Sequence, residues 1–532
     1  MPNLQPTDNG NKPNPLLLPE IACGINKYIY DKQDSLSLAV TCRSLFYSIM
    51  PVHWKTLGGI ENLLRLIPGT MIKRESYILE SGERWKVIIT IPESALTSSW
   101  ERYWLYAPFI QGLYMHVFES IVLDGWNILF AKRNETGGSL LPNLVRLDTI
   151  SEPINQLAWF RLFLSPSLRV LTLQDYVAIS VEIDTDSSYK SVSSANLDSE
   201  LNATSDSQTQ LLLESQYTTT SLGYGAPAIQ RTGPPGSLVR KERLSWVDYL
   251  PMLTNLTYVH IYSDNAPAGS GEALIILGHL PHLERLGMHG DFESQSRSSV
   301  LIQEEPLPIP SDLFPRLKTL HLLSMPGTRL FYYIWNSEAM VSKLTSARVR
   351  FGSNPASVTR NELAFKIIPV LCKYSPNLTK LDISVAFKDG LSDSESSASE
   401  MLFQLLSRLP LSSLSFDIGP EKIEGDWTVC RRTVFPLLQW LDLSPLLLPN
   451  QLRALVLLFP NLRYLNACPN LGKTQSAGAY AFESSESASP IKPVSAYIYV
   501  GNEIDHKDFK SHFFIERFPE LTRWGLQVVV AD

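Results

Sequence analysis

The densest group of imidazole side chains in the sequence is formed by His279, His282 and His289. Imidazole nitrogens at such short spacing could bind zinc, but zinc sites usually combine them with cysteine or carboxylate ligands at similar spacing. These histidines lack such a ligand, and His289 falls in a predicted strand. We therefore expect no metal ion to bind here.

Catalytic motifs are also missing from the sequence. It contains neither a glycine-rich P-loop for phosphates nor a Gly-x-Ser-x-Gly turn around a nucleophilic serine. Cys42 falls in a predicted helix, where a core role is favoured over a role as nucleophile. An enzyme on an α/β fold would need titratable residues that converge in a pocket, and no such group can be assembled. We expect a protein that is not an enzyme and that has no cofactor.

The chemistry that the sequence does favour is protein binding. Large polar and aromatic residues alternate with leucines, so they should point away from the buried face of predicted strands. Tyrosine, tryptophan and arginine dominate the binding energy of protein interfaces, although the aromatic rings could instead cover neighbouring strand edges. The residues expected on this face are Arg146, Tyr258, His260, Tyr262, Arg285, His289, His321, Lys380, Asp382, Trp440, Asp442, Tyr464 and Asn466. Those predicted to bind a protein ligand are Tyr258, His260, Tyr262, Arg285, His321, Lys380, Trp440 and Tyr464, with Tyr258, Trp440 and Tyr464 as the main anchors.

A repeated unit, Pro-x-Leu-x-x-Leu-x-Leu, would position these side chains. Its well-formed copies begin at Pro142, Pro166, Pro281, Pro315, Pro376, Pro436, Pro460 and Pro519. Degenerate copies contain Phe118/Ile121/Leu123, Leu256/Val259/Ile261, Leu344/Ala347/Val349, Leu411/Leu414/Phe416 and Val494/Tyr497/Tyr499. With one exception, the first apolar positions follow one another at steps of 24 to 34 residues, near or slightly above the period of leucine-rich repeats.

The alternation Leu-x-Leu has period 2 and predicts a short strand with one buried face. Helical spacing is present in residues 363–374 and 400–409. One unit cannot bury its apolar face alone, so stacked units should form a parallel sheet. The fold class expected is α/β, with a small all-α domain followed by a repeat solenoid that has strands on its concave face and helices and loops on its convex face. The alternative, a doubly wound α/β domain, would not carry the same Pro-x-Leu start eight times.

The composition is that of a folded soluble protein, since 44% of the 532 residues are hydrophobic and 19% are charged. A net charge of −7 gives no basis for nucleic-acid binding. No apolar window is long enough to span a membrane, and the polar N-terminus lacks the apolar core of a signal peptide. Five scattered cysteines fit a reducing compartment, so we expect a protein of the cytoplasm, the nucleus or both.

Residues 16–57 do not follow the repeat. They contain two stretches with helical spacing, and Asp34 is predicted to cap the second. The segment resembles the F-box, a helical motif that begins Leu-Pro-x-Glu, continues with apolar helices and Val-Cys-Arg, and ends with a tryptophan. The residues that carry the resemblance are Leu18, Pro19, Glu20, Ile21, Leu36, Leu38, Val40, Cys42, Arg43, Phe46 and Trp54. The pattern departs from the motif where Glu20 directly follows Pro19 and where Thr41 separates Val40 from Cys42.

The chain thus resembles F-box proteins with leucine-rich repeats, of the fungal type. The resemblance implies that three short helices dock on a Skp1-like adaptor, which in turn binds a cullin scaffold. The adaptor-binding residues it implies are Leu18, Pro19, Ile21, Ile25, Leu36, Leu38, Val40, Cys42, Phe46 and Trp54. An ordinary helical cap over the first repeat is the alternative for this segment.

By the same resemblance, the chain would be the substrate-recognition subunit of an SCF (Skp1–cullin–F-box) ubiquitin ligase. The concave face of the repeats would bind the protein substrate for ubiquitin-dependent degradation. The chain would be a monomer within this hetero-complex, with no nucleic-acid or membrane partner. A leucine-rich-repeat scaffold that binds a partner without any ligase role is the alternative function.

The domain organisation expected from these patterns begins with a disordered segment at 1–15 and an F-box-like domain at 16–57. A linker or capping segment at 58–112 and the solenoid at 113–532 follow. The one long step, 88 residues from Leu168 to Leu256, contains a polar stretch that predicts a disordered insert at 185–240. Further loops are predicted at 291–310, 388–400 and 473–493.

Overall fold

The structure, a computed structural model, divides the chain into two units, of which one, residues 179–244, lies wholly outside the described residues. The predictions for 1–15, 185–240 and 473–493, and for most of 291–310 and 388–400, also fall outside them. So does the repeat that begins at Pro519. The described residues are 18–79, 82–115, 119–149, 156–175, 246–263, 271–290, 308–325, 328–352, 358–385, 396–417, 435–447, 459, 461–469 and 495–498.

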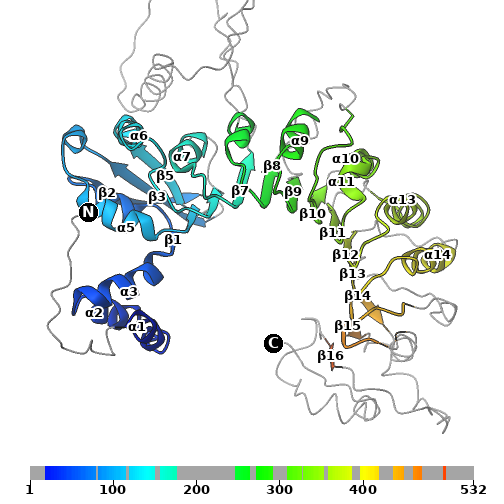
Figure 1. The fold of residues 1–532 in the computed structure, drawn as a ribbon. Coiled ribbons are helices and arrows are strands. Elements are labelled where there is room, and N and C mark those ends of the chain that lie inside the picture. The colour runs from blue at the N-terminus through cyan, green and yellow to red at the C-terminus, as the bar shows by residue number, and fades with distance from the viewer. Residues whose placement is uncertain are drawn as a thin grey trace, which may run out of the picture. The chain divides into compact units, whose positions relative to one another are not determined.

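Thirteen strands within these ranges form one sheet whose strand order follows the order of the chain. Every neighbouring pair is parallel (Figure 1). This α/β architecture is compatible with an α/β solenoid. The strands are β1 (Thr56–Gly58), β4 (Gly112–Met115), β6 (Arg146–Thr149), β7 (Val170–Asp175), β8 (Tyr258–Ser263), β9 (Arg285–Gly290), β10 (Thr319–Met325), β11 (Ser346–Phe351), β12 (Lys380–Ser384), β13 (Ser413–Asp417), β14 (Trp440–Leu447), β15 (Tyr464–Pro469) and β16 (Ser495–Ile498).

The predicted alternation of buried and outward residues is confirmed in the repeats of β10, β12 and β14. In β12, for example, Leu381 and Ile383 are buried, whereas Lys380 is exposed. In β6, β7 and β9 the residue between the two apolar positions (Asp148, Thr172 and Gly287) is buried as well. The leucine three residues before the strand is buried as well, as Leu378 shows. Parallel pairing in equal register places the buried residues of neighbouring strands side by side. They form a row that runs through Leu147, Leu171, Val259, Leu286, Leu320, Ala347, Leu381, Leu414, Leu441 and Leu465.

Asparagine side chains add a second link between repeats, which the sequence pattern did not predict. Each lies three residues before the start of a strand, and its side-chain amide donates to a backbone carbonyl of the preceding repeat. These hydrogen bonds are exposed, so each adds only a modest stabilisation to the stacking. The Nδ2–O distances are 2.8 Å for Asn143 to Pro108, 2.8 Å for Asn255 to Pro166, 3.3 Å for Asn377 to Ser342 and 2.6 Å for Asn461 to Pro436.

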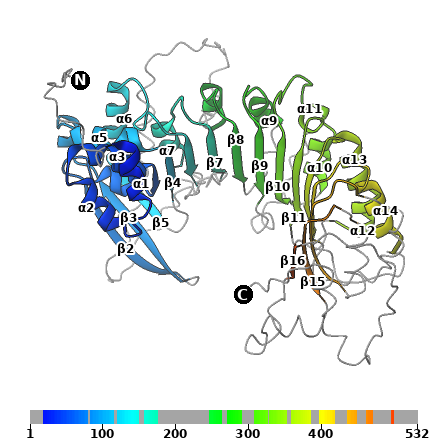
Figure 2. The ribbon, with the colours of Figure 1, turned by 60° about the horizontal axis from the view of Figure 1, so that its bottom comes forward.

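Helices lie along one side of the sheet (Figure 1, Figure 2). The predicted helical spacing around Leu363 is confirmed, with Leu363, Ile367 and Leu371 all buried, although the first turn is a π-helix. The helix after β12 begins at Ser396, so it includes the last residues of the segment predicted as a loop. The elements on this side are α6 (Trp126–Glu135), α7 (Gln156–Phe163), η4 (Trp246–Met252), α9 (Gly271–Gly278), α10 (Thr328–Trp335), α11 (Glu338–Val341), α12 (Arg360–Glu362), η7 (Leu363–Ile367), α13 (Ile368–Tyr374) and α14 (Ser396–Leu406).

The start of the sheet differs from the prediction. The strand expected at Phe118/Ile121/Leu123 is β5 (Glu119–Asp124), which pairs with β3 (Gly82–Thr90) in a separate three-stranded sheet. On its other side β3 pairs with β2 (Met71–Leu79). The main sheet instead includes β1 and β4. The segment 58–112, predicted as a linker or capping segment, lies between these two strands and contains β2 and β3 of the second sheet. All six residues of β5 pair with β3, so this long-range pairing, and not the local repeat pattern, decides which sheet the strand joins.

The last described strand is shifted by one residue from the prediction. Tyr497 was expected on the buried face, but it pairs with Asn466, which lies on the outward face. Ala496 pairs instead with the buried Leu465. A slip of one residue moves a strand's side chains to the opposite face, and the degenerate pattern of this repeat was too weak to fix the register.

Three helices precede the sheet: α1 (Pro19–Asn26), α2 (Lys32–Ala39) and α3 (Arg43–Trp54). Pro19 begins α1, where its missing N–H costs nothing. The prediction that Asp34 caps α2 is wrong, because Asp34 lies inside the first turn. Asp31 is the N-cap, and its Oδ1 accepts a hydrogen bond from the backbone N–H of Gln33 at 2.7 Å. Short elements connect these helices to the sheets: α4 (Glu61–Leu64), η2 (Glu93–Leu96), α5 (Glu101–Tyr106) and η3 (Ala107–Phe109).

We expect Leu381→Ala to lower the free energy of unfolding by about 2–5 kcal/mol, because it leaves a cavity between three packed strands. Lys380→Ala, one residue earlier and exposed, should change it by less than about 0.5 kcal/mol. Urea unfolding followed by tryptophan fluorescence would measure both. Equal effects of the two substitutions would contradict the observed alternation.

Candidate interaction surfaces

The three N-terminal helices pack around a small core formed by Ala39, Ile49 and Met50. Half-buried apolar side chains complete this core and join it to the following segment. The Trp54 ring lies 4.4 Å from the Tyr106 ring, measured between centroids. Four residues predicted to bind the adaptor are partly buried, because they pack against this core. They are Leu36, Leu38, Phe46 and Trp54.

A buried polar contact also ties the three helices together. Ser35 is almost fully buried, and its Oγ hydrogen-bonds to Asn26 and to Nε2 of His53, so one hydroxyl connects α1, α2 and α3. Burial, followed by the nearby charge of Lys32, lowers the pKa of His53. The neutral imidazole is therefore favoured in this contact.

The remaining predicted adaptor-binding residues lie largely on the outside of the helical domain. Leu18, Ile21 and Ile25 are 43%, 43% and 39% exposed. Their spacing of i, i+3 and i+7 puts them in one stripe along α1. Val40 is 73% exposed, Pro19 is exposed at the start of α1, and Cys42 is half-buried at the N-cap of α3. The apolar stripe of Leu18, Ile21 and Ile25, here called the α1 stripe, is available to a partner.

The same helical domain carries further exposed apolar residues that are not among the predicted adaptor-binding residues. Tyr28 is 80% and Tyr30 is 97% exposed, and Tyr47 and Val52 are about half exposed. Such a concentration within residues 18–52 is unusual, because apolar residues at the surface of a monomer are normally scattered. Their signal in the sequence is weak, since they lie between the motif positions.

In the main sheet, the outward residues lie in rows across the strands, set by the parallel register. The first row begins each strand and runs through Arg146, Val170, Tyr258, Arg285, Thr319, Ser346, Lys380, Ser413, Trp440 and Tyr464. The second row, two residues later, runs through Asp148, Thr172, His260, Gly287, His321, Arg348, Asp382, Ser415, Asp442 and Asn466.

The carboxylates of the second row are held by neighbouring donors. Arg348 Nε and Arg350 Nη2 lie 2.5 Å and 3.3 Å from Oδ2 of Asp382, and only the Arg350 contact is aligned as a hydrogen bond. Asp442 accepts hydrogen bonds from Ser415 Oγ at 3.2 Å and Asn466 Nδ2 at 2.9 Å. Burial raises the pKa of Asp442, and these two hydrogen bonds oppose the rise.

A cluster of aromatic and imidazole rings occupies the middle of the sheet face. The His260 ring stacks on the Tyr262 ring, with centroids 4.4 Å apart, and its Nδ1 lies 3.1 Å from Tyr258 Oη. The ring fits because Gly287 on β9 has no side chain; a Cβ there would lie 2.8 Å from the imidazole. Only the register of β8 and β9 reveals this role of Gly287.

The cluster brings together five of the predicted ligand-binding residues, Tyr258, His260, Tyr262, Arg285 and His321, which lie on three neighbouring strands. His260, however, is only 8% exposed, so it offers little surface to a ligand. Burial, with smaller contributions from the nearby His321 and His289, lowers the pKa of His260 to about 4. As a neutral ring, His260 stacks on Tyr262 and hydrogen-bonds with Tyr258.

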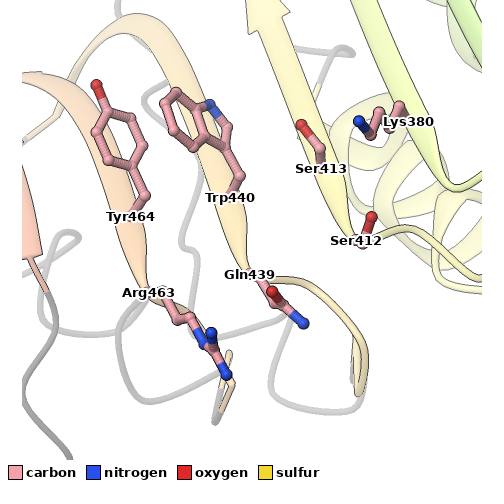
Figure 3. Close-up of a pocket in the computed structure, with 7 residues that line it drawn as sticks. All are labelled: Lys380, Ser412, Ser413, Gln439, Trp440, Arg463 and Tyr464. Atoms are coloured by element: carbon pink, nitrogen blue, oxygen red, sulfur yellow. The ribbon is translucent and has the colours of Figure 1, made fainter. Parts of the chain in front are cut away.

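The other three predicted residues, Lys380, Trp440 and Tyr464, line one pocket of about 440 Å³ (Figure 3). The Trp440 and Tyr464 rings stack with centroids 3.4 Å apart, and Trp440 remains 44% exposed. The sequence analysis missed the other lining residues because they precede the strands or are small. These residues are Ser412, Ser413, Gln439 and Arg463.

Within the described ranges, no group of three histidine, cysteine or acidic side chains is placed to hold a metal ion. None of the helices in these ranges is long and apolar enough to cross a bilayer. Comparison with known proteins adds nothing to this description, because no protein-family model and no curated protein matches the chain with significant similarity.

We expect the stability of the protein to fall by about 2 kcal/mol between pH 7 and pH 5 through His260 alone. In this range the unfolded chain protonates its histidine, whose ordinary pKa is 6.5, while the folded protein, with a pKa of about 4, does not. The stabilisation is therefore present above pH 6.5 and is lost as the pH falls towards 4. Urea unfolding at both pH values, in wild type and His260→Gln, tests this. A variant with the wild-type pH dependence would show that another group is responsible.

Proposed function

We propose that this protein is an F-box protein with leucine-rich repeats that acts as the substrate-recognition subunit of an SCF ubiquitin ligase. The observation that carries the proposal is the α1 stripe. It lies on a three-helix domain directly before a parallel sheet of repeats, and it exposes apolar side chains that have no partner within the described helices.

The N-terminal half of the proposal rests on residue types as well as exposure. Leu18 and Pro19 begin the F-box-like motif and also begin α1, and Ile21 and Ile25 continue the stripe. A helix that leaves three apolar side chains in water gains free energy when a partner covers them, by roughly 25 cal/mol for each Å² buried. Helix-in-groove docking on a Skp1-like adaptor would supply that cover.

The repeat half of the proposal rests on the regularity of the sheet. Strands of Leu-x-x-Leu-x-Leu repeats follow one another in chain order, each with its buried row continuous with the next. Such an array builds an extended face of outward side chains that can bind another protein. The aromatic, basic and hydroxyl residues of the first row fit this role.

The proposed mechanism is positioning and involves no chemistry by this chain. The adaptor and the cullin scaffold would hold the chain near a separate ubiquitin-conjugating enzyme, and the sheet face would hold the substrate. Fixing two reactants close together raises the rate of transfer without any catalytic residue in the receptor. The chain would act as a monomer in this hetero-complex, in the cytoplasm, the nucleus or both.

We expect the full chain to co-purify with Skp1, and expect Leu18→Glu with Ile21→Glu to reduce the bound Skp1 at least tenfold. Two carboxylates would have to be buried unpaired in the adaptor groove, which costs several kcal/mol. Both positions are more than one third exposed, so the substitutions should leave the fold intact. Co-expression followed by quantification of the Skp1 in the purified complex measures the effect.

A matched control is Phe365→Glu, which places the same charge on an apolar side chain that is 47% exposed in η7, on the helix side of the sheet. It should leave Skp1 binding unchanged. If the wild-type chain does not bind Skp1, the ligase proposal fails. The repeat sheet would then be a scaffold for another partner, and Leu18→Glu with Ile21→Glu would leave that binding intact.

A further inference from the structure

The pocket at Trp440 has the shape of a slot, because a small residue separates two long ones in the first row. Lys380, Ser413 and Trp440 start three consecutive strands and pair with one another in register. Figure 3 shows Ser413 between the other two side chains. Neighbouring strands lie about 4.8 Å apart, so Lys380 and Trp440 start roughly 10 Å apart, with only a serine on the floor between them.

The indole of Trp440 forms one wall of this slot with its free face. Tyr464, on the strand that follows, covers the other face of the ring at 15° between planes. The uncovered face is therefore turned towards Ser413, and the stack holds the ring upright on the sheet. A planar ring that enters the slot could stack on this face, and the ammonium group of Lys380 lies on the far side, where cation–π attraction favours an aromatic ring.

The charge around the slot is positive and is not compensated by the carboxylates nearby. Lys380 and Arg463 are exposed, and neither forms an ion pair with another described residue. The second-row aspartates of the same strands are occupied: Asp382 contacts two arginines, and Asp442 accepts from Ser415 and Asn466. The free cations therefore favour a ligand that brings its own negative charge.

From this geometry we propose that the slot binds a segment of a partner protein in which an aromatic side chain is flanked by acidic residues. The aromatic ring enters between Trp440 and Lys380 over Ser413, and the flanking carboxylates contact Lys380 and Arg463. Gln439 offers hydrogen bonds to the segment's backbone, and Ser412 Oγ, which donates to the Thr379 carbonyl at 3.1 Å, can accept one. The inference rests on the proposed function, since it names the class of substrate that the sheet face would select.

The volume and the surroundings of the pocket support a protein segment as the occupant. The pocket, of about 440 Å³, is a shallow, open one on the face of the sheet, so it suits a segment that lies across the strands better than an enclosed small molecule. It lies at the strand starts, where the outward first row leads on to Ser346 and Thr319 in one direction. A chain bound in the slot can therefore continue across neighbouring strands, as a substrate of this sheet face would.

The test uses the full chain and a short fluorescent peptide with one phenylalanine flanked on both sides by glutamates. Fluorescence anisotropy should show saturable binding that weakens as salt is added. A peptide with alanine in place of phenylalanine, and one with lysines in place of the glutamates, should each bind at least tenfold more weakly. A loss of tenfold corresponds to 1.4 kcal/mol.

Three substitutions probe the slot itself. Ser413→Phe fills the slot without removing a charge, Lys380→Glu reverses one wall, and Trp440→Ala removes the stacking face; each should weaken peptide binding at least tenfold. The matched controls are Lys366→Glu and Phe365→Ala, which make the same kinds of change at exposed positions of η7. They should bind the peptide as the wild type does. Thermal unfolding of each variant checks that the fold is kept.

Several outcomes would overturn the inference. They are a wild-type chain that does not bind the peptide, a Ser413→Phe variant that binds it normally, or a chain that binds a nucleoside monophosphate but not the peptide. Skp1 co-purification separates this inference from the proposed function. A chain that binds Skp1 but not the peptide would refute the slot alone, and a chain that binds the peptide but not Skp1 would refute the ligase role alone.

Discussion

Leu381 and its counterparts in neighbouring strands can be shielded from water only if the strands lie side by side and in register. Each strand carries too little apolar surface to fold alone, so the stability of every repeat depends on the next. The same register that aligns the leucines also aligns the residues between them. The outward rows are therefore a direct consequence of burying the inward row, and any surface that the main sheet offers to a partner is built from them.

Small residues then give the outward rows their shape. Gly287 leaves the space into which the His260 ring fits, and Ser413 leaves the slot between Lys380 and Trp440. In the first case the space is filled from within, by a ring whose pKa is lowered by that burial. In the second it stays open. The difference comes from the neighbouring side chains. The His260 ring on β8 packs against Gly287, whereas the Lys380 and Trp440 side chains stand on either side of Ser413.

The N-terminal helices follow a different physical rule from the repeats. Their core is small. Leu36, Leu38, Phe46 and Trp54 pack against it, whereas the α1 stripe remains exposed. In the repeat array, an exposed apolar side chain such as Trp440 is flanked by basic and hydroxyl groups. The two surfaces thus suit two kinds of partner, one that buries an apolar helix face and one that brings an acidic segment to an aromatic wall.

The sequence by itself determined the strands whose Pro-x-Leu-x-x-Leu-x-Leu pattern is complete. Alternation with period 2 puts the two leucines of such a strand on one face, and that face is the one that is buried. It also placed Lys380, Trp440 and Tyr464 on the outward face. Where the local pattern was degenerate, tertiary pairing decided the outcome. Residues 119–124 joined a second sheet, and the strand at 495–498 paired in a register shifted by one residue from the predicted one. The burial of His260 and the slot over Ser413 depend on which residues of different strands become neighbours. Only the folded sheet brings those positions together, because they lie dozens of residues apart along the chain.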